Sequence, residues 1–460
     1  MLPAMNIPTD FQRDCMTLRS IADEVSALAG HMAQAQNEMG ARKRGYFLPN
    51  EDDQVRRILL AYRNYRIALF EIIHRYRELD EFDQDEEQML AFLLAFGSAV
   101  ILFNWSSLLV NTYRDIPHIR AKLNEADARF GMPANLFEQI CDSLSNADNL
   151  VQLRDAADSF ADHDDWHTSA AVNTDFAWLI DEIRRQYEQV RRSHVDIFRS
   201  HVGRRLQNLQ DKAKQPLRNA GYLIRSWVMD VFGNTWLTLA DYPTVPEPHI
   251  DAFLDLLQPG DFFIVRPEQK ASTVFLPGWW THVALYHGGI KKLRTIGADR
   301  CQHVTATMSM LGDDSLVTIE ALAAGVVCNP IERTLRVDHA VAVRPRLTLK
   351  NRLQAIDNAF GHFGKRYDFE FDFSRSDRLV CTELLYRSYH GLGDIAFSPV
   401  TRLGRPTISA DDIAAYIMRT LTDNTGTFEL LAMSFKPPDS DAEFLTGEAC
   451  RQRFKMTAST

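Results

Sequence analysis

Residues 378–386 read Arg-Leu-Val-Cys-Thr-Glu-Leu-Leu-Tyr, and they place one cysteine, Cys381, where a loop is expected to become an amphipathic helix. Leu384, Leu385 and Tyr386 predict the buried face of a helix over 381–389, which ends at Tyr389, and Gly391 fits a C-terminal cap. A thiol at a helix N-terminus has its thiolate favoured by the helix dipole and by free backbone N–H groups. The sequence therefore predicts a reactive cysteine. The ordinary alternative, a small buried apolar residue, is kept for the other cysteines, Cys15, Cys141, Cys301, Cys328 and Cys450.

A partner for this thiol lies upstream, in the run Thr-His-Val-Ala-Leu-Tyr at 281–286. Strand alternation places His282 on the same face as Ala284 and Tyr286. A histidine on a neighbouring strand can take the proton of a thiol. Glu320 ends the apolar run 316–320, and a carboxylate at a strand end can accept the imidazole N–H and fix the tautomer. Cysteine and histidine so arranged indicate a cysteine hydrolase or acyltransferase.

Several short motifs follow one another in a fixed order along the second half of the chain. They are Pro259-Gly260-Asp261, Trp280-Thr281-His282, Ile319-Glu320-Ala321, Gly364-Lys365-Arg366-Tyr367-Asp368 and Leu379-Val380-Cys381-Thr382-Glu383. This ordered set resembles the circularly permuted branch of the NlpC-type papain-like hydrolases. More narrowly, it is similar to the YiiX/YebB-like members, which are related to the lecithin–retinol acyltransferase group. The resemblance covers about residues 256–420, and the histidine strand precedes the cysteine helix, the reverse of the papain order.

The resemblance implies a role for each matching residue. Cys381 would be the nucleophile, His282 the base, and Glu320 the polar residue that orients the histidine. Tyr367 would line the site. We add Thr382 and Trp280 as candidates for substrate binding or oxyanion stabilisation, and we expect neither a metal nor a cofactor. The segments 267–280 and 289–314 are longer than the pattern needs, so the substrate of the family does not transfer to this chain.

Composition excludes several other classes of protein. A net charge of −10 argues against a nucleic-acid-binding protein. The six cysteines contain no CxxC pair, which argues against a zinc site or a secreted disulfide framework. The N-terminus has no basic segment followed by an apolar one, so we expect no signal peptide and a cytoplasmic location. Association with a membrane is a further expectation, based on two helical segments.

The chain has 460 residues, and its pattern of apolar residues changes near the middle. Apolar residues at helical spacing predict an all-α domain over 1–240, with helices over 10–36, 51–79, 86–113, 117–127, 134–142, 145–161 and 174–214. Three prolines within 243–248 predict an extended linker over 241–257. An α+β catalytic domain is expected over 258–425, with strands at 261–266, 282–287, 316–319 and 340–343 and helices at 351–363, 381–389 and 409–421. Residues 426–460 would form a C-terminal extension.

Two helical segments raise the question of a membrane. Residues 89–110 carry no charge and have the length of a membrane span, although Asn104, Ser106 and Ser107 interrupt the apolar run as in a buried core helix. Residues 191–214 are strongly basic, which fits either a solvated helix face or contact with an anionic membrane surface.

Three functions follow as hypotheses. The first is a cysteine hydrolase that cleaves a peptide, isopeptide or lipid amide through an acyl-enzyme. The second is a lipid-directed thiol acyltransferase or esterase at a membrane surface. The third is a non-catalytic binding module, against which the intact pair of Cys381 and His282 speaks.

Overall fold

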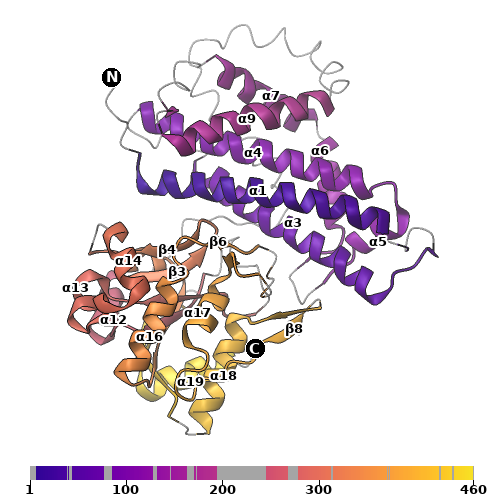
Figure 1. Cartoon of the computed structure of the whole chain (residues 1–460). Coiled ribbons are helices and arrows are strands. Elements are labelled where there is room, and N and C mark those ends of the chain that lie inside the picture. The colour runs from indigo at the N-terminus through magenta and orange to yellow at the C-terminus, as the bar shows by residue number, and fades with distance from the viewer. Residues whose placement is uncertain are drawn as a thin grey trace. The chain divides into compact units, whose positions relative to one another are not determined.

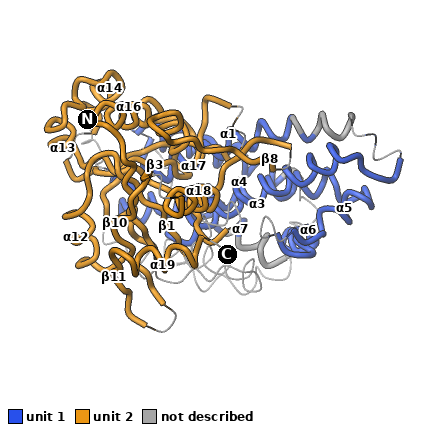
Figure 2. Tube along the Cα trace, turned by 90° about the horizontal axis from the view of Figure 1, so that it is seen from below, with its two compact units in different colours: residues 1–128, 132–238 blue, residues 129–131, 239–460 orange. Residues whose placement is uncertain are grey.

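The chain divides into two compact units, one of residues 1–128 and 132–238 and one of residues 129–131 and 239–460 (Figures 1 and 2). This is a computed structural model. It describes residues 7–38, 40, 44–76, 85–127, 132–145, 147–162, 170–171, 173–193, 245–267, 278–311, 314–369, 371, 373, 375–402, 404–423, 426–437 and 440–458.

The elements described in the first unit are helices joined by turns and one isolated β-bridge between Asp127 and Met132, as expected of a helical domain. Its helices are α1 (Thr9–Glu38), α3 (Pro49–Arg75), α4 (Asp85–Tyr113), α5 (Pro117–Leu123), α6 (Leu136–Ser145), α7 (Ala147–Ala161) and α9 (Thr174–Ser193). Helix α4 is central and packs against α1, α3 and α9 (Figure 1). The expected helix over 174–214 is described only to Ser193, so most of the basic segment 191–214 lies outside the described residues.

Helix α4 contains the uncharged segment 89–110, and neighbouring helices bury it. It is long and apolar enough to cross a membrane, but 89% of its most apolar window is buried inside the structure. Its polar residues are satisfied internally: Asn104 Nδ2 donates to the Gln186 carbonyl at 2.7 Å, and the Ser106 hydroxyl contacts the Tyr62 hydroxyl at 2.7 Å. Gly97 lets α9 approach, because a Cβ there would lie 2.8 Å from a Leu179 methyl group. Of the two alternatives for residues 89–110, a membrane span and a buried core helix, these contacts fit the buried core helix.

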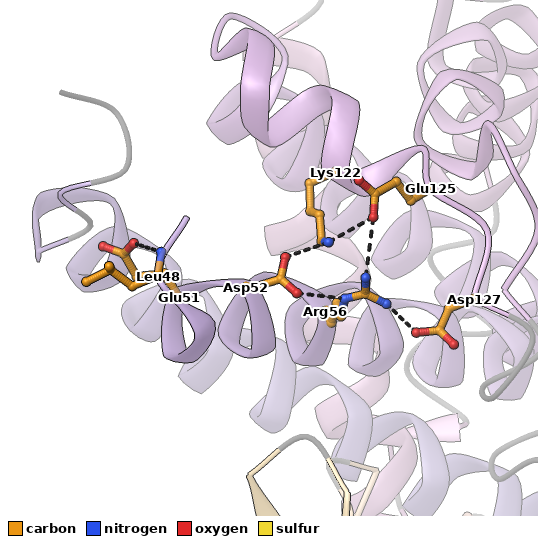
Figure 3. A network of polar contacts seen from close by, with 7 residues as sticks. All are labelled: Leu48, Glu51, Asp52, Arg56, Lys122, Glu125 and Asp127. Atoms are coloured by element: carbon orange, nitrogen blue, oxygen red, sulfur yellow. Dashed lines mark hydrogen bonds and ion pairs between the residues drawn. The ribbon is translucent and has the colours of Figure 1, made fainter. Parts of the chain in front are cut away.

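A polar network ties α3 to α5 and the turn that follows it (Figure 3). Asp52 accepts from Arg56 at 3.1 Å and from Lys122 at 2.6 Å. Arg56 also reaches Glu125 at 3.3 Å and pairs with the buried Asp127. Isolated exposed ion pairs contribute little stability, but a network that shares one guanidinium orders several segments together.

The second unit is built on an antiparallel sheet. Within the described residues it has seven strands in the order β11-β10-β5-β1-β2-β3-β4. They are β1 (Asp261–Arg266), β2 (His282–Tyr286), β3 (Thr318–Leu322), β4 (Gly325–Asn329), β5 (His339–Pro345), β10 (Phe428–Phe435) and β11 (Glu443–Thr446). The predicted strands at 261–266, 282–287, 316–319 and 340–343 correspond to β1, β2, β3 and β5.

Helices and two small strand pairs complete this unit. The helices are α12 (Glu247–Leu256), α13 (Gly289–Thr295), α14 (Gln302–Leu311), α15 (Ile331–Thr334), α16 (Leu349–Phe360), α17 (Cys381–Tyr389), α18 (Ala410–Thr422) and α19 (Gly447–Ala458), with a 3-10 turn η4 (Ala298–Arg300). β6 (Arg366–Tyr367) pairs with β7 (Arg378–Leu379), and β8 (Val400–Arg402) pairs with β9 (Arg405–Thr407). Helices α16 and α17 lie side by side (Figure 1). The predicted α+β fold class is thus confirmed.

The expected extended linker over 241–257 is wrong for most of its length, because α12 occupies 247–256. Pro246 is the N-cap of this helix and Pro248 lies in its first turn, where a proline removes no intrahelical hydrogen bond. Phe253 packs edge-on against Phe263 of β1, with ring centroids 5.3 Å apart. The segment therefore belongs to the core of the second unit.

The expected C-terminal extension over 426–460 is also wrong. Strand β10 pairs with β5, and β11 pairs with β10, so this segment forms one side of the sheet. Helix α19 packs against β10 and β11. The sequence interpretation missed these strands because their pairing partner β5 lies far away along the chain.

Candidate active site

Helix α17 begins at Cys381 and ends at Tyr389, the bounds that the sequence predicts. Val380 is its N-cap in an extended conformation, and the Leu384 N–H donates to the Val380 carbonyl at 2.9 Å. At the other end the Tyr389 hydroxyl donates to the Gly260 carbonyl at 2.8 Å. The helix is thereby fixed against the start of β1, and the Cys381 thiol lies on its first turn with 6% of the residue exposed.

His282 is the first residue of β2, where it pairs with Val265 of β1. Its Nε2 lies 2.7 Å from Glu320 Oε2. Cys381 lies close to the same ring, since its charge and its hydrogen bonding both raise the pKa of His282. The structure thus brings together the three residues that the sequence singles out for catalysis.

Glu320 reaches His282 because of the register of β3. Leu285 pairs with Ile319, so Glu320 lies beside Ala284. Ala284 and His282 are two residues apart on β2 and therefore share a face of the sheet. The pairing of β2 with β3 places the carboxylate diagonally across from the imidazole.

Electrostatics favour charge on both members of this pair. Burial opposes the imidazolium, but the charge of Cys381, its hydrogen bond and the Glu320 carboxylate outweigh that effect and raise the pKa of His282 to about 10. Burial likewise opposes the carboxylate, yet three hydrogen bonds hold the pKa of Glu320 below its ordinary value. An ionised Glu320 beside a protonated His282 is the arrangement that stabilises a thiolate.

Two residues in contact with Glu320 are not apparent from the sequence. Asn329 Nδ2 donates to Glu320 Oε1 at 2.8 Å, and the Thr334 hydroxyl donates to the same oxygen at 2.7 Å. Asn329 ends β4 and Thr334 ends the single turn α15. The only local signal is the Asn329-Pro330 dipeptide, which indicates a turn and nothing about a neighbouring carboxylate.

Tyr367 and Thr382 both lie at the thiol. Tyr367 pairs with Leu379 in the parallel β6–β7 ladder, close to the start of α17. Burial and the charge of Cys381 raise the pKa of Tyr367 well above its ordinary value. The Thr382 hydroxyl is buried on the first turn of α17 and has no hydrogen-bond partner among the described residues.

Trp280 does not form an open rim for substrate. It is 1% exposed, and its ring packs against Phe454 with centroids 5.7 Å apart. The Trp279 and Trp280 N–H groups both donate to the Asp411 carboxylate, at 2.8 and 2.7 Å. The expected role of Trp280 in substrate binding is therefore replaced by one in packing: this tryptophan ties the chain before His282 to α18 and α19.

A second buried carboxylate lies on α17 itself. Glu383 is fully buried two residues after Cys381, and its Oε1 accepts from Arg387 Nε at 2.8 Å. Burial raises the pKa of Glu383 to about 7 in spite of Arg387, and the nearby Asp368 adds to the shift. The sequence shows this residue only as a polar position of an amphipathic helix.

Groups of three or more His, Cys, Asp and Glu side chains that could hold a metal are absent from the described part of the chain. All six cysteines are free thiols. The polar groups at the site are thus those of a thiol, an imidazole and a carboxylate, an arrangement suited to nucleophilic attack on a carbonyl.

Residues 256–444 match the model of a family described as permuted papain-like amidase enzyme, YaeF/YiiX, C92 family. This match bears out the resemblance drawn from the motif order, over residues 256–444 of the second unit. It also supports a cysteine hydrolase as the class of enzyme. Comparisons with curated proteins and with solved structures gave no match.

Proposed function

We propose that this permuted papain-like domain hydrolyses an amide bond, with Cys381 as nucleophile, His282 as proton carrier and Glu320 as the residue that orients His282. The observation that carries the proposal is the 2.7 Å contact of His282 Nε2 with the buried Glu320, together with Cys381 on the first turn of α17, close enough to the same ring to raise the pKa of His282. The substrate is a peptide, an isopeptide or a lipid amide.

The first half-reaction forms a thioester. Cys381 passes its proton to His282 Nδ1, and the sulfur bonds to the amide carbon while the carbonyl π electrons move to oxygen. When this intermediate collapses, the C–N bond breaks and His282 gives the proton to the leaving nitrogen. In the second half-reaction water adds to the thioester and His282 accepts a proton from it. The C–S bond then breaks, which releases a carboxylic acid and restores the thiol.

The start of α17 supports the charge that develops on the carbonyl oxygen. The first N–H groups of a helix have no acceptor within the helix, so those near Cys381 are available to an oxyanion. The buried hydroxyl of Thr382 is a further donor on the same turn. Tyr367 lines the site on the side of the β6–β7 pair.

Alkylation of the thiol tests the nucleophile. We expect iodoacetamide to modify Cys381 fastest of the six cysteines at neutral pH, because its thiolate is stabilised by His282. The Cys381→Ala variant should lose the fast phase, and His282→Ala should slow it. Cys301, which is half-buried and has Asp357 and Asp299 as its charged neighbours, offers a matched control, since Cys301→Ala should keep the fast phase. A fast phase that survives in Cys381→Ala would contradict the assignment.

Profiling against acyl compounds tests the bond. A library of peptide amides, N-acyl lipids and the corresponding esters is incubated with the wild type and with Cys381→Ala. We expect amide cleavage that depends on Cys381 and releases acid and amine in equal amounts. Turnover of the esters alone, or transfer of the acyl group to a second lipid in place of water, would overturn the proposal in favour of an esterase or acyltransferase.

A further inference from the structure

We propose that Asn329 and Thr334 are positioning residues that hold Glu320 in the orientation in which it fixes His282 for reaction with Cys381. This inference rests on the proposed function and extends the site by one layer beyond the three residues that carry it. Neither residue contacts the thiol, and both act through Glu320.

The geometry shows that Glu320 is held at both oxygens. Oε2 receives His282 Nε2 at 2.7 Å, whereas Oε1 receives Asn329 Nδ2 at 2.8 Å and the Thr334 hydroxyl at 2.7 Å. Glu320 is 2% exposed, Asn329 is fully buried and Thr334 is 4% exposed. Bonds at both oxygens leave the carboxylate no freedom to rotate away from the imidazole.

The direction of each hydrogen bond follows from the ionised state of Glu320. A carboxylate only accepts, so the single proton of Thr334 is committed to Oε1. Thr334 Oγ1 also lies 2.7 Å from Thr318 Oγ1, and the proton in that contact must therefore come from Thr318. Thr318 Oγ1 also lies 3.0 Å from the main-chain carbonyl of Asn329, and its one proton cannot serve both acceptors. That carbonyl still receives the Val317 N–H at 2.9 Å. The hydrogen bonds of His282, Asn329 and Thr334 to Glu320 are thus all donated to its carboxylate.

The consequence for His282 is a fixed tautomer. With Oε2 acting as an acceptor, Nε2 carries a proton and Nδ1 is the position that exchanges a proton with the thiol. Without the donors on Oε1, the buried carboxylate would be less favourable as an anion and would stabilise the imidazolium less. Asn329 and Thr334 therefore act on the thiol through two intervening groups.

The local fold places both donors over Glu320. Asn329 is the last residue of β4, and Pro330 caps the short turn α15 that ends at Thr334. The Asn329 amide makes its bond to Glu320 while its own Oδ1 has no partner within the described residues. A flipped amide would direct an oxygen at the carboxylate, so the charge of Glu320 sets the orientation of Asn329.

The test compares three threonine variants for the rate of Cys381 alkylation as a function of pH. Thr334→Val keeps the shape of the side chain and removes the hydroxyl, Thr334→Ser keeps the hydroxyl, and Thr457→Val removes a buried hydroxyl that bonds only within α19. We expect Thr334→Val to slow alkylation at neutral pH about tenfold, the usual effect of one hydrogen bond to a charged group. Thr334→Ser should stay within about twofold of the wild type, and Thr457→Val should match it.

A second measurement reads His282 directly. His282 interacts with Cys381 and Glu320, Tyr367 lies close to the thiol, and Glu383 titrates two residues after Cys381 on α17. NMR titration of the imidazole nitrogens should give a lower pKa for His282 in Thr334→Val than in the wild type. Asn329→Asp places a second carboxylate against Glu320 and should also change the titration curve of His282. The shape of that curve should differ from the one for Thr334→Val.

The outcomes separate the two proposals. If the wild type has no fast alkylation that depends on Cys381, the proposed function fails, and the positioning role fails with it. If the wild type has that fast phase but Thr334→Val behaves like Thr457→Val in both the alkylation profile and the His282 titration, the positioning role alone is overturned.

Discussion

Glu320 on β3 and Glu383 on α17 are two buried glutamates close to the same thiol, and their protonation equilibria shift in opposite directions. Three donors, from His282, Asn329 and Thr334, keep the pKa of Glu320 low in spite of its burial. Glu383 has Arg387 at Oε1 and a hydrogen bond from the Val380 backbone, but its Oε2 has no partner among the described residues. Burial, with the charge of Asp368, raises its pKa to about 7 in spite of these donors.

The difference shows that burial does not decide the charge of a carboxylate by itself. Desolvation penalises the anion at both positions, and the donors at each oxygen and the neighbouring charges decide whether that penalty is overcome. On the sheet side of Cys381 the donors are complete and the carboxylate is an anion. On the helix side they are incomplete and the carboxylate takes up a proton near neutrality. The experiments below challenge this contrast in turn.

Removing the charge of Glu320 should have the largest effect. Glu320→Gln keeps the size of the side chain but loses the anion that stabilises the His282 imidazolium. By analogy with the loss of the aspartate in a serine triad, we expect amide hydrolysis to fall about a thousandfold. The measurement is kcat on the amide substrate found by profiling, and Glu332→Gln, an exposed residue on α15, is the matched control. Wild-type turnover in Glu320→Gln would show that the anion has no role in the reaction.

Glu383 should affect stability in a defined range of pH. Its folded pKa of about 7 lies above the ordinary 4.5, so between these values the folded state binds more protons than the unfolded state. The free energy of unfolding should therefore fall as the pH rises from about 4.5 to about 7, by on the order of 3 kcal/mol from this residue.

Glu383→Gln should remove this component of the pH dependence. Urea unfolding of the full chain at a series of pH values gives the difference between variant and wild type, which should grow in favour of the variant as the pH rises. The exposed Glu332→Gln variant should give a constant difference. If Glu383→Gln also gave a constant difference, Glu383 would be an anion like Glu320 and the contrast would be lost.

Local patterns sufficed for the elements that carry the three central residues. Helical spacing after Cys381 and strand alternation around His282 are signals within a few residues, and both α17 and β2 form where they predict. Helix α18 likewise lies within the predicted range 409–421 but for its last residue, and Ser409 caps it by accepting from the Asp412 N–H. Glu320 could be singled out from the sequence only because of its place in the order of motifs along the chain.

Features that depend on distant pairing were not predictable in this way. Asn329 meets Glu320 only because β4 folds back on β3, and Trp280 is buried only because α19 returns to cover it. The prolines before α12 suggested an extended chain because their effect depends on position: at the N-cap and in the first turn they are compatible with a helix. Local sequence patterns predict where helices and strands form, whereas the order of strands in the sheet determines which distant residues come into contact.

The contribution of the thiol to the state of His282 can be separated from that of Glu320. In Cys381→Ala the sulfur is gone while the carboxylate and its donors remain. We expect the pKa of His282 to fall from about 10 toward its ordinary 6.5 without reaching it, because Glu320 still stabilises the imidazolium. NMR titration of the imidazole measures this value. A pKa unchanged in Cys381→Ala would mean that Glu320 alone accounts for the shift, and a pKa below the ordinary value would mean that burial outweighs Glu320 once the thiol is gone.

Tyr389→Phe tests the contrast between Glu320 and Glu383 by a change at the C-terminal end of α17. It should have the smallest effect. It removes the bond from the Tyr389 hydroxyl to the Gly260 carbonyl and leaves that carbonyl without this donor. We expect a loss of about 1 kcal/mol in the free energy of unfolding, equal at every pH between 5 and 8. The alkylation profile of Cys381 should keep its midpoints, since neither carboxylate loses a donor. A shift of those midpoints would mean that anchoring α17 at β1, and not the donors at each carboxylate, sets the charges around the thiol.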